Sequence, residues 1–231
     1  MAQPPSQTDI FLREVDENLR RDQMEHFAKK YGKWLIAAVV LFLIAAGGFI
    51  YWQQYRQRQA EKQVEQLVEI DKALGTGSID QAKRLGPLAE NGAKAVRAAA
   101  KFTQAAVALE KDDTQGATAK YRELANDGSV PEPYRNAALI RQTSLEFDSI
   151  KPEEAINRLQ PLAKPGNPWF GSAAELTAAA LFKQGKKAEA GQLYATIAKD
   201  KGAPPTLRAR AAQLASSLGV EVGAVLPAAA Q

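Results

Sequence analysis

The 231-residue sequence contains no cysteine and only one histidine, His26. Without cysteine the chain forms no disulfide, has no thiolate nucleophile and offers no sulfur ligand to zinc. A single imidazole with no thiolate beside it also falls short of the usual ligand set of a structural or catalytic zinc site. These absences exclude several common classes of catalytic and metal centre.

The sequence also lacks a strong excess of one charge. Lysine and arginine number 30 against 26 aspartate and glutamate residues, for a net charge of +4. After residue 52 the balance is 24 to 20, and in residues 1–33 it is 6 to 6. Neither part has the clustered basic face with interleaved aromatic residues that nucleic-acid binding requires. We therefore expect no nucleic-acid partner and an ordinary solvated surface.

No cofactor loop or acid–base pair stands out. The GTGSID segment at 75–80 has two glycines but lacks the third glycine and the preceding strand of a dinucleotide-binding loop. Glu153 and Glu154 suit a helix N-terminus, where the helix dipole favours negative charge, and Asp112 with Asp113 suits a loop and helix cap. We predict that the chain is not an enzyme and uses no cofactor, metal or small-molecule substrate.

One long apolar segment is present. From Trp34 to Trp52, nineteen residues carry no charge, and as a helix they span roughly 28 Å, close to the hydrocarbon thickness of a bilayer. Tryptophan at both ends suits the membrane interface. A buried core helix would be shorter, and a cleaved signal peptide would not carry a 33-residue leader. The sequence predicts one transmembrane anchor at 34–52, bounded by Trp34 and Trp52.

The charges beside the anchor favour one orientation without deciding it. Within twenty residues of the span, five lysines and arginines precede it and four follow it. This small excess favours a cytoplasmic N-terminus. In either orientation the bilayer separates His26 from the rest of the chain, so His26 joins no catalytic triad there.

The segments on both sides of the anchor are predicted to be helical. Before it, residues 1–33 contain an amphipathic helix at 9–31, which either leads into the anchor or docks on a cytoplasmic partner. After it, residues 53–78 form a helical stalk that glycine ends. Ser78 and Gln81 have the spacing of a capping box for the next helix.

The remaining sequence repeats itself. Three stretches align, namely GATAKYREL (116–124), EAINRLQPL (154–162) and EAGQLYATI (189–197). Each has an alanine followed at +4 and +7 by a large residue, which places all three on one helix face. The predicted repeat-packing residues are Ala117, Tyr121, Leu124, Ala155, Leu159, Leu162, Ala190, Tyr194 and Ile197. Their alanines are 38 and 35 residues apart.

Prolines with a similar period precede the alanine-rich helices between these stretches. Pro133, Pro168 and Pro205 are 35 and 37 residues apart, and proline costs no hydrogen bond in the first helical turn. Paired helices with a period of about 34 residues are typical of tetratricopeptide repeats. Because one pair cannot bury its apolar face alone, the copies must stack.

The predicted fold class is therefore all-α, with one N-terminal transmembrane helix followed by a tetratricopeptide repeat-like α-solenoid of stacked helical hairpins. The repeat domain covers residues 79–219 and ends in a capping helix, Thr206–Leu218, closed by Gly219. Residues 220–231 are predicted to form a flexible tail.

Trp169 and Phe170 are candidate partner contacts. They follow Pro168 at a repeat junction. Two interpretations remain open, since the two rings either pack between repeats or form an exposed anchor for a bound peptide.

Short motifs around the anchor carry a family resemblance. Residues 27–33 read FAKKYGK and residues 51–55 read YWQQY. With the repeats, these segments resemble the YfgM-like ancillary subunits of the bacterial SecYEG translocon, and the leader DIFLREVDENLRRD resembles alphaproteobacterial members. The resemblance covers residues 25–218.

The resemblance implies a single-pass protein of the cell inner membrane with a cytoplasmic N-terminus and a periplasmic repeat domain. It also implies protein partners, namely the Sec translocon, periplasmic folding factors and emerging secreted chains. The expected function is a translocon-associated scaffold with a chaperone-like role. The alternative is a repeat-domain scaffold for envelope assembly or cell division.

Overall fold

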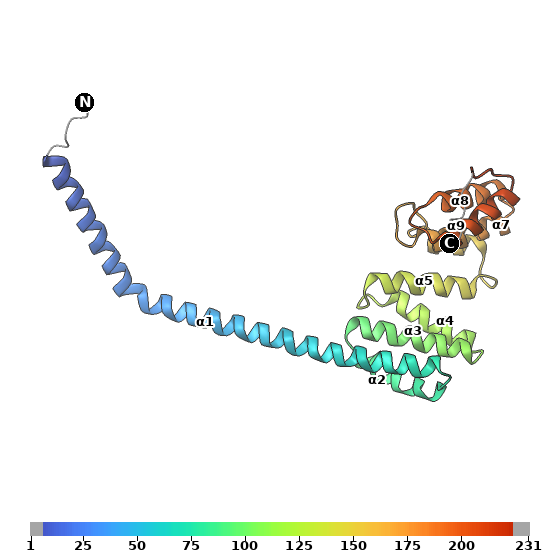
Figure 1. Ribbon diagram of the computed structural model, residues 1–231, viewed down its shortest axis with the longest axis horizontal. Helices are drawn as coiled ribbons and strands as arrows, with labels where there is room; N and C mark the ends of the chain where they lie inside the picture. Colours follow the sequence, from blue (N-terminus) through green and yellow to red (C-terminus); the bar gives the residue numbers. More distant parts are fainter. Residues whose placement is uncertain (1–6, 224–231) are drawn as a thin grey trace, which may run out of the picture. The chain divides into compact units, whose positions relative to one another are not determined.

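The computed structural model describes residues 7–223, without the side chains of residues 7–29, 31, 32 and 35. Within this range the chain is helical and contains no strand (Figure 1). The chain divides into two compact units, Met1–Gln59 and Ala60–Gln231. The helices are α1 (Gln7–Gly75), the 3-10 helix η1 (Ile79–Arg84), α2 (Leu85–Asn91), α3 (Lys94–Glu110), α4 (Thr114–Asn126), α5 (Glu132–Glu146), α6 (Pro152–Leu159), α7 (Phe170–Lys183), α8 (Lys187–Lys199) and α9 (Pro205–Ser217).

Helix α1 is continuous over 69 residues. The predicted pre-membrane helix, anchor and stalk are therefore parts of one helix. No proline occurs between Pro5 and Pro87, and single glycines weaken a helix without ending it. The helix stops where Gly77 adopts a positive φ of 89°, which lets the Ser78 N–H donate back to the Ala73 carbonyl at 3.0 Å.

The apolar part of α1 has no protein packed around it. None of its most apolar 18-residue window is buried, and Phe42 and Ile44 are each 70% exposed. Such a continuous apolar surface is unfavourable in water. In the described part of the chain, α1 is the one helix long and apolar enough to cross a membrane, which is consistent with single-pass anchoring.

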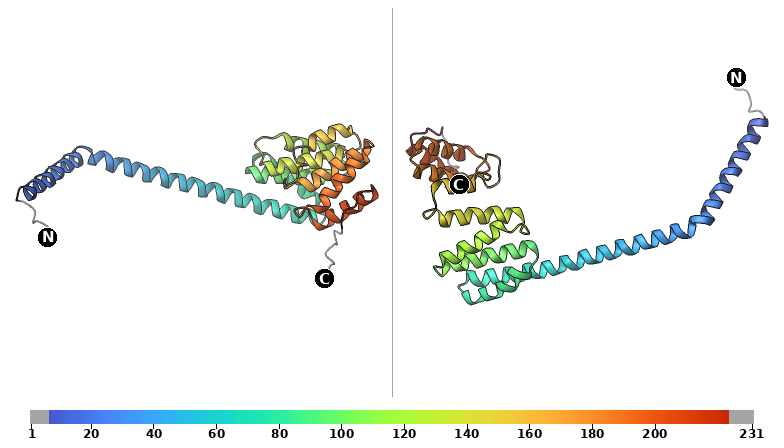
Figure 2. Two further views of the ribbon diagram at one scale, coloured as in Figure 1. Left: turned by 90° about the horizontal axis from the view of Figure 1, so that it is seen from above. Right: turned by 180° about the vertical axis from the view of Figure 1, so that it is seen from behind.

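The second unit is a stack of helical hairpins. Each helix packs chiefly against its neighbours in the sequence, most extensively α4 against α5, α8 against α9, α7 against α8 and α3 against α4, whereas α5 and α6 touch much less. The views in Figure 1 and Figure 2 show α2 to α5 lying side by side. Packing that depends on neighbouring repeats is the organisation of a solenoid. The predicted all-α, tetratricopeptide repeat-like fold class is confirmed.

Alanine dominates the contacts between the hairpins. Ala98 of α3, Ala117 of α4 and Ala138 of α5 are each fully buried in one apolar cluster. Because alanine projects only one methyl group, the helix backbones approach closely at these crossings. Large residues such as Tyr121 and Leu124 fill the space beside them.

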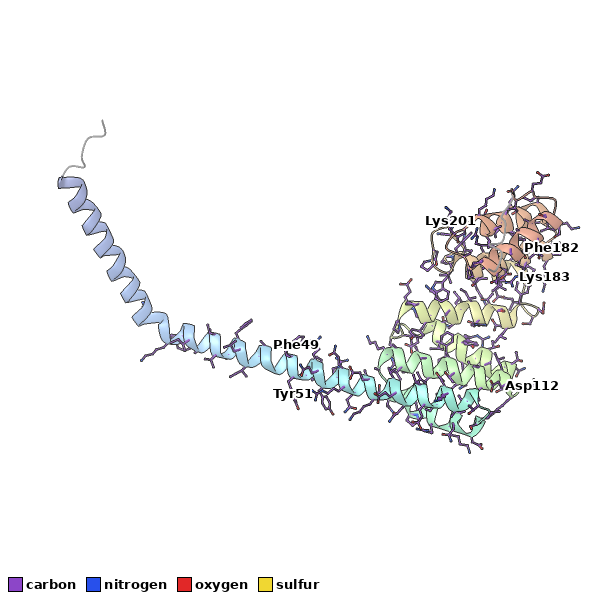
Figure 3. The ribbon with its side chains drawn as sticks, in the orientation of Figure 1. Phe49, Tyr51, Asp112, Phe182, Lys183 and Lys201 are labelled. Carbon is purple, nitrogen blue, oxygen red and sulfur yellow. The ribbon has the colours of Figure 1, made fainter. Side chains whose placement is uncertain are left out.

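Four helix ends in the described chain share one turn conformation. Positive φ angles occur at Gly77, Asp112, Gly185 and Gly219, which follow α1, α3, α7 and α9. In each turn the next residue donates its N–H to a carbonyl five residues earlier, at 2.9 to 3.0 Å. Asp112, at φ 59°, is the one of these four residues that is not a glycine, and it lies in the turn between α3 and α4 (Figure 3).

The start of the repeat unit differs from the prediction. Ser78 precedes η1 without any side-chain capping bond, so the capping box with Gln81 does not form. The Ser78 N–H, which a capping box would direct to the Gln81 side chain, already closes the end of α1. A 3-10 helix, which suits short tight segments, fills the position instead.

The end of the repeat unit also differs. Helix α9 and Gly219 lie where the sequence predicts a capping helix. Val220 and Val222, however, pack against the last apolar cluster, where the sequence predicts a flexible tail. A methyl group on Gly191 of α8 would lie 2.7 Å from Val220 Cγ2, so that glycine makes room for the valine. Residues 224–231 lie outside the described residues.

Candidate protein-binding surface

The nine predicted repeat-packing residues lie in the interior. Their exposed fractions run from 0% to 6%. The Tyr121 ring packs against Phe102 of α3 at an angle of 60°, with ring centroids 5.3 Å apart. Burial raises the pKa of Tyr121 and of Tyr194. These residues hold consecutive helices together and leave almost no surface for a partner.

The two predicted partner contacts have different surroundings. Phe170 is 1% exposed and belongs to the cluster of α7, α8 and α9, so it packs between repeats and is not an exposed anchor. Trp169 is half-buried against the neighbouring cluster around Leu159. The backbone N–H of Trp169 donates to Asn167 Oδ1 at 2.8 Å, which orders the turn before α7. Packing therefore accounts for Phe170, and Trp169 keeps part of its ring accessible.

The anchor residues are exposed on α1. Trp34 and Trp52 are 76% and 53% exposed. The Arg56 guanidinium lies 4.7 Å from the centre of the Trp52 ring, and Phe49 lies on the other side of Trp52 along the helix. This end of the apolar segment therefore carries a stacked aromatic and cationic group.

A polar cleft of about 470 Å³ lies in the first half of the repeat unit. Helix α3 contributes Arg97, Lys101 and Gln104, whose +4 and +7 spacing places them on one helix face. Helix α2 forms one side, and α4 with the turn after it forms the other. The lining residues are Gly86, Ala89, Glu90, Arg97, Lys101, Gln104, Glu123, Asp127 and Ser129.

The charged groups of this cleft are partly paired and partly available. Lys101 pairs with Glu123, and Arg97 Nη2 donates to Ser129 Oγ at 2.8 Å. Hydrogen bonds from the Ser129 hydroxyl and backbone N–H hold the pKa of Asp127 below its usual range, with smaller contributions from the nearby Lys101 and Arg97 charges. Arg97 Nε is buried and has no hydrogen-bond partner. The cleft thus places a buried donor without a partner beside acidic side chains, and we expect such a mixed polar lining to suit a peptide segment.

An ion-pair network centred on Glu146, the charged staple, links three helices. Glu146 at the end of α5 pairs with Arg122 of α4 and Arg158 of α6, and it accepts a 3.0 Å hydrogen bond from Gln142. Burial raises the pKa of Glu146, but these three donors more than offset it, so the pKa lies below its usual range. The staple therefore links α4, α5 and α6.

The sequence alone did not identify the cleft or the staple. Both depend on side chains from three helices, and neither has a motif of fixed spacing. The +4 and +7 pattern of α3 was a usable signal for one side of the cleft only. In the range that the structure describes, no group of three or more histidine, cysteine, aspartate or glutamate side chains is placed to hold a metal ion.

Comparison with known proteins adds one match. The family model described as a tetratricopeptide repeat-like domain matches residues 25–216. The match begins before the apolar segment and ends inside α9, so it covers the anchor and the repeats together. Neither the comparison with curated proteins nor that with solved structures gave a match.

Proposed function

Because this chain belongs to the tetratricopeptide repeat-like family, we propose that it is a protein-binding scaffold without catalytic activity, held in a membrane by one helix. The supporting observation is that one family match covers both an unburied apolar helical segment and the stacked hairpins. The anchor keeps the repeats near one membrane surface. Confinement of this kind raises the effective concentration of membrane-bound partners and makes weak contacts sufficient.

The finer proposal is an ancillary role at the Sec translocon. Its support is the resemblance of the FAKKYGK and YWQQY segments, together with the repeats, to YfgM-like subunits. In this role the N-terminus lies in the cytoplasm, and the repeat domain lies in the periplasm of a bacterial cell. There it meets translocon subunits, folding factors and emerging secreted chains.

We propose the polar cleft of α2, α3 and α4 as the partner-binding site. Arg97 Nε is a buried donor without a partner, and a buried polar group gains free energy when a ligand satisfies it. The surrounding Glu90, Gln104 and Asp127 supply acceptors and a further donor. An unfolded segment presents backbone N–H and C=O groups that match such a mixed surface.

Topology mapping tests the orientation. A reporter active only in the periplasm, fused after Gln231, should be active, and the same reporter fused at the N-terminus should be inactive. A cytoplasmic C-terminus would overturn every periplasmic role at once.

Site-specific cross-linking tests the partner and the site together. A photoreactive residue at Gln104 lines the cleft, and one at the exposed Gln115 of α4 lies outside it. We expect Gln104 to cross-link translocon subunits or folding factors, and Gln115 to cross-link them much less. Equal yields would reject the cleft, and absence of these proteins from both adducts would reject the translocon role. Labelling of division or envelope-assembly proteins would support the alternative scaffold.

A further inference from the structure

The two ends of the apolar segment carry different cations. The N-terminal end has Lys30 and Lys33, and the C-terminal end has Arg56 and Arg58. Lysine is a compact point charge, whereas arginine offers a planar fork of N–H donors that matches two oxygens of one phosphate. The C-terminal end therefore has the chemistry of a phosphate site.

The arginines continue two aromatic stripes along α1. Trp52 and Arg56 follow Phe49 at +3 and +7, and Tyr55 and Arg58 follow Tyr51 at +4 and +7, so each arginine shares a helix face with two aromatic residues. Phe49 and Tyr51 project from opposite sides of the helix (Figure 3). In the first stripe the contacts are direct, with ring centroids of Phe49 and Trp52 6.4 Å apart and the Arg56 guanidinium 4.7 Å from the Trp52 ring.

Neither arginine has an acidic partner among the described residues. No acidic residue occurs between Glu25 and Glu61, and none of the ion pairs of the described residues involves Arg56 or Arg58. The contact with the Trp52 ring orients the Arg56 guanidinium, and because a cation–π contact needs no hydrogen bond, the N–H donors remain available to an anion. Two positive charges, of which Arg56 is oriented by Trp52, thus have no ion-pair partner among the described residues.

Their height above the apolar segment matches the phosphate layer. Arg56 and Arg58 lie four and six residues beyond Trp52, which is roughly 6 and 9 Å along the helix axis. The headgroup region adds roughly 5 to 7 Å to each side of the hydrocarbon. Both side chains can therefore reach lipid phosphates, whereas the aromatic rings beneath them lie at the hydrocarbon boundary.

From these observations we propose that the C-terminal end of the apolar segment binds the phosphates of anionic phospholipids through Arg56 and Arg58, with Trp52 orienting Arg56. This inference rests on the proposed membrane anchoring and adds a lipid preference to it. The bound lipid fixes the depth at which α1 leaves the bilayer. The preference for anionic over zwitterionic headgroups follows from the two uncompensated positive charges.

The test uses the full-length chain in vesicles of phosphatidylcholine containing phosphatidylglycerol. Vesicle flotation is measured first, and then electron spin resonance of spin-labelled lipids gives the relative association of the two lipids with the protein. We expect wild type to prefer phosphatidylglycerol, and the double variant Arg56→Gln, Arg58→Gln to lose about fivefold or more of that preference. The lysines at the opposite end account for what remains.

Matched variants make the result specific. Lys62→Gln removes one positive charge from the same helix, ten residues beyond Trp52 and above the headgroup layer, and should leave the preference unchanged. Arg56→Lys with Arg58→Lys keeps the charge but removes the fork, and should give an intermediate value. Excess inorganic phosphate should not abolish the lipid preference. If it does, the site belongs to free phosphate and the lipid proposal is overturned.

Two outcomes separate this inference from the proposed function. A wild-type chain that does not float with vesicles would overturn both the anchor and the lipid site. Normal flotation with the same lipid preference in wild type and in the double glutamine variant would overturn the lipid site alone. That second result is also the one expected if the arginines serve carboxylates of a membrane protein.

Discussion

The apolar segment of α1 and the repeat unit use the same side chains in opposite surroundings. Phe42 and Ile44 are each 70% exposed on α1, whereas Phe170 and Ile197 are 1% and 0% exposed within the repeats. A lone helix has no neighbour to bury its apolar atoms, so it needs an apolar solvent. The repeats supply that environment to one another through close alanine contacts. Apolar content alone therefore does not distinguish a core from an anchor.

The largest expected effect comes from removing the same ring in both regions. Phe170→Ala leaves a cavity in a closed core and should lower the free energy of unfolding by about 3 to 5 kcal/mol. Phe42→Ala removes a ring that no protein atom surrounds, so it should leave the unfolding of the repeats unchanged. Urea unfolding in mild detergent, followed by circular dichroism, measures both, and equal midpoints would contradict the comparison.

A charge added to α1 should distinguish a segment that lies in lipid from one that lies in water. Leu41→Arg places a cation near the middle of the apolar segment, and we expect insertion to become less favourable by about 3 kcal/mol. Val68→Arg changes a side chain that is also exposed on α1, at 60%, but lies in the second unit. The Val68 variant should float with vesicles like wild type, and a smaller fraction of the Leu41 variant should float. Identical flotation would indicate that the segment does not cross the bilayer.

Removing the charge of Glu146 measures what an ion-paired group contributes inside the repeats. The apolar segment of α1 has no charged residue, so it offers no counterpart. Glu146→Gln removes charge-assisted hydrogen bonds to two arginines and should cost about 2 kcal/mol of stability at neutral pH. Since donors lower the pKa of Glu146 from its ordinary 4.5, its contribution is complete above pH 4.5 and is lost as the pH falls through the lowered pKa.

Denaturation at several pH values measures this dependence. The difference in stability between wild type and Glu146→Gln should shrink below pH 4.5. Glu69→Gln is the control, because Glu69 is exposed and its pKa is lowered only by its contact with Arg84. A constant difference between wild type and Glu146→Gln across this range would refute the role of the ionised carboxylate.

The smallest expected effect compares two glycines. At Gly171 an added methyl group would lie 2.8 Å from Leu207 Cδ2, whereas at Gly47 it would meet nothing within 4 Å. Gly171→Ala gains helix propensity but strains the contact with α9, for a net loss of about 1 kcal/mol. Gly47→Ala should leave the repeats unchanged. Thermal midpoints of the two variants decide the matter, and a stabilised Gly171 variant would mean that Leu207 moves aside freely.

Much of the architecture could be predicted because it depends on periodicity. The +4 and +7 triplets placed Tyr121, Leu159 and Tyr194 on helix faces that the structure buries, and Gly219 lies at the end of α9. The capping box at Ser78 could not be judged from spacing, since the same N–H closes the preceding helix. Two hydrogen-bond patterns competed for one residue, and the tertiary structure selected between them.

The candidate site was much less predictable. The sequence left two interpretations of Phe170 open, packing between repeats and an exposed peptide anchor, because its neighbours in the core come from α8 and α9. The cleft joins Glu90, Arg97 and Asp127 from three elements. No local pattern encodes which of these side chains face one another, nor that Arg97 Nε is left without a partner.

The sequence by itself determined the helical class, the uncharged segment from Trp34 to Trp52 and the period of the repeats, because each depends on residues close together along the chain. Only the tertiary structure decided which apolar residues are enclosed, how Glu146 joins three helices and where a polar cleft opens. Those properties depend on contacts between distant residues, and such contacts exist only after the hairpins have stacked.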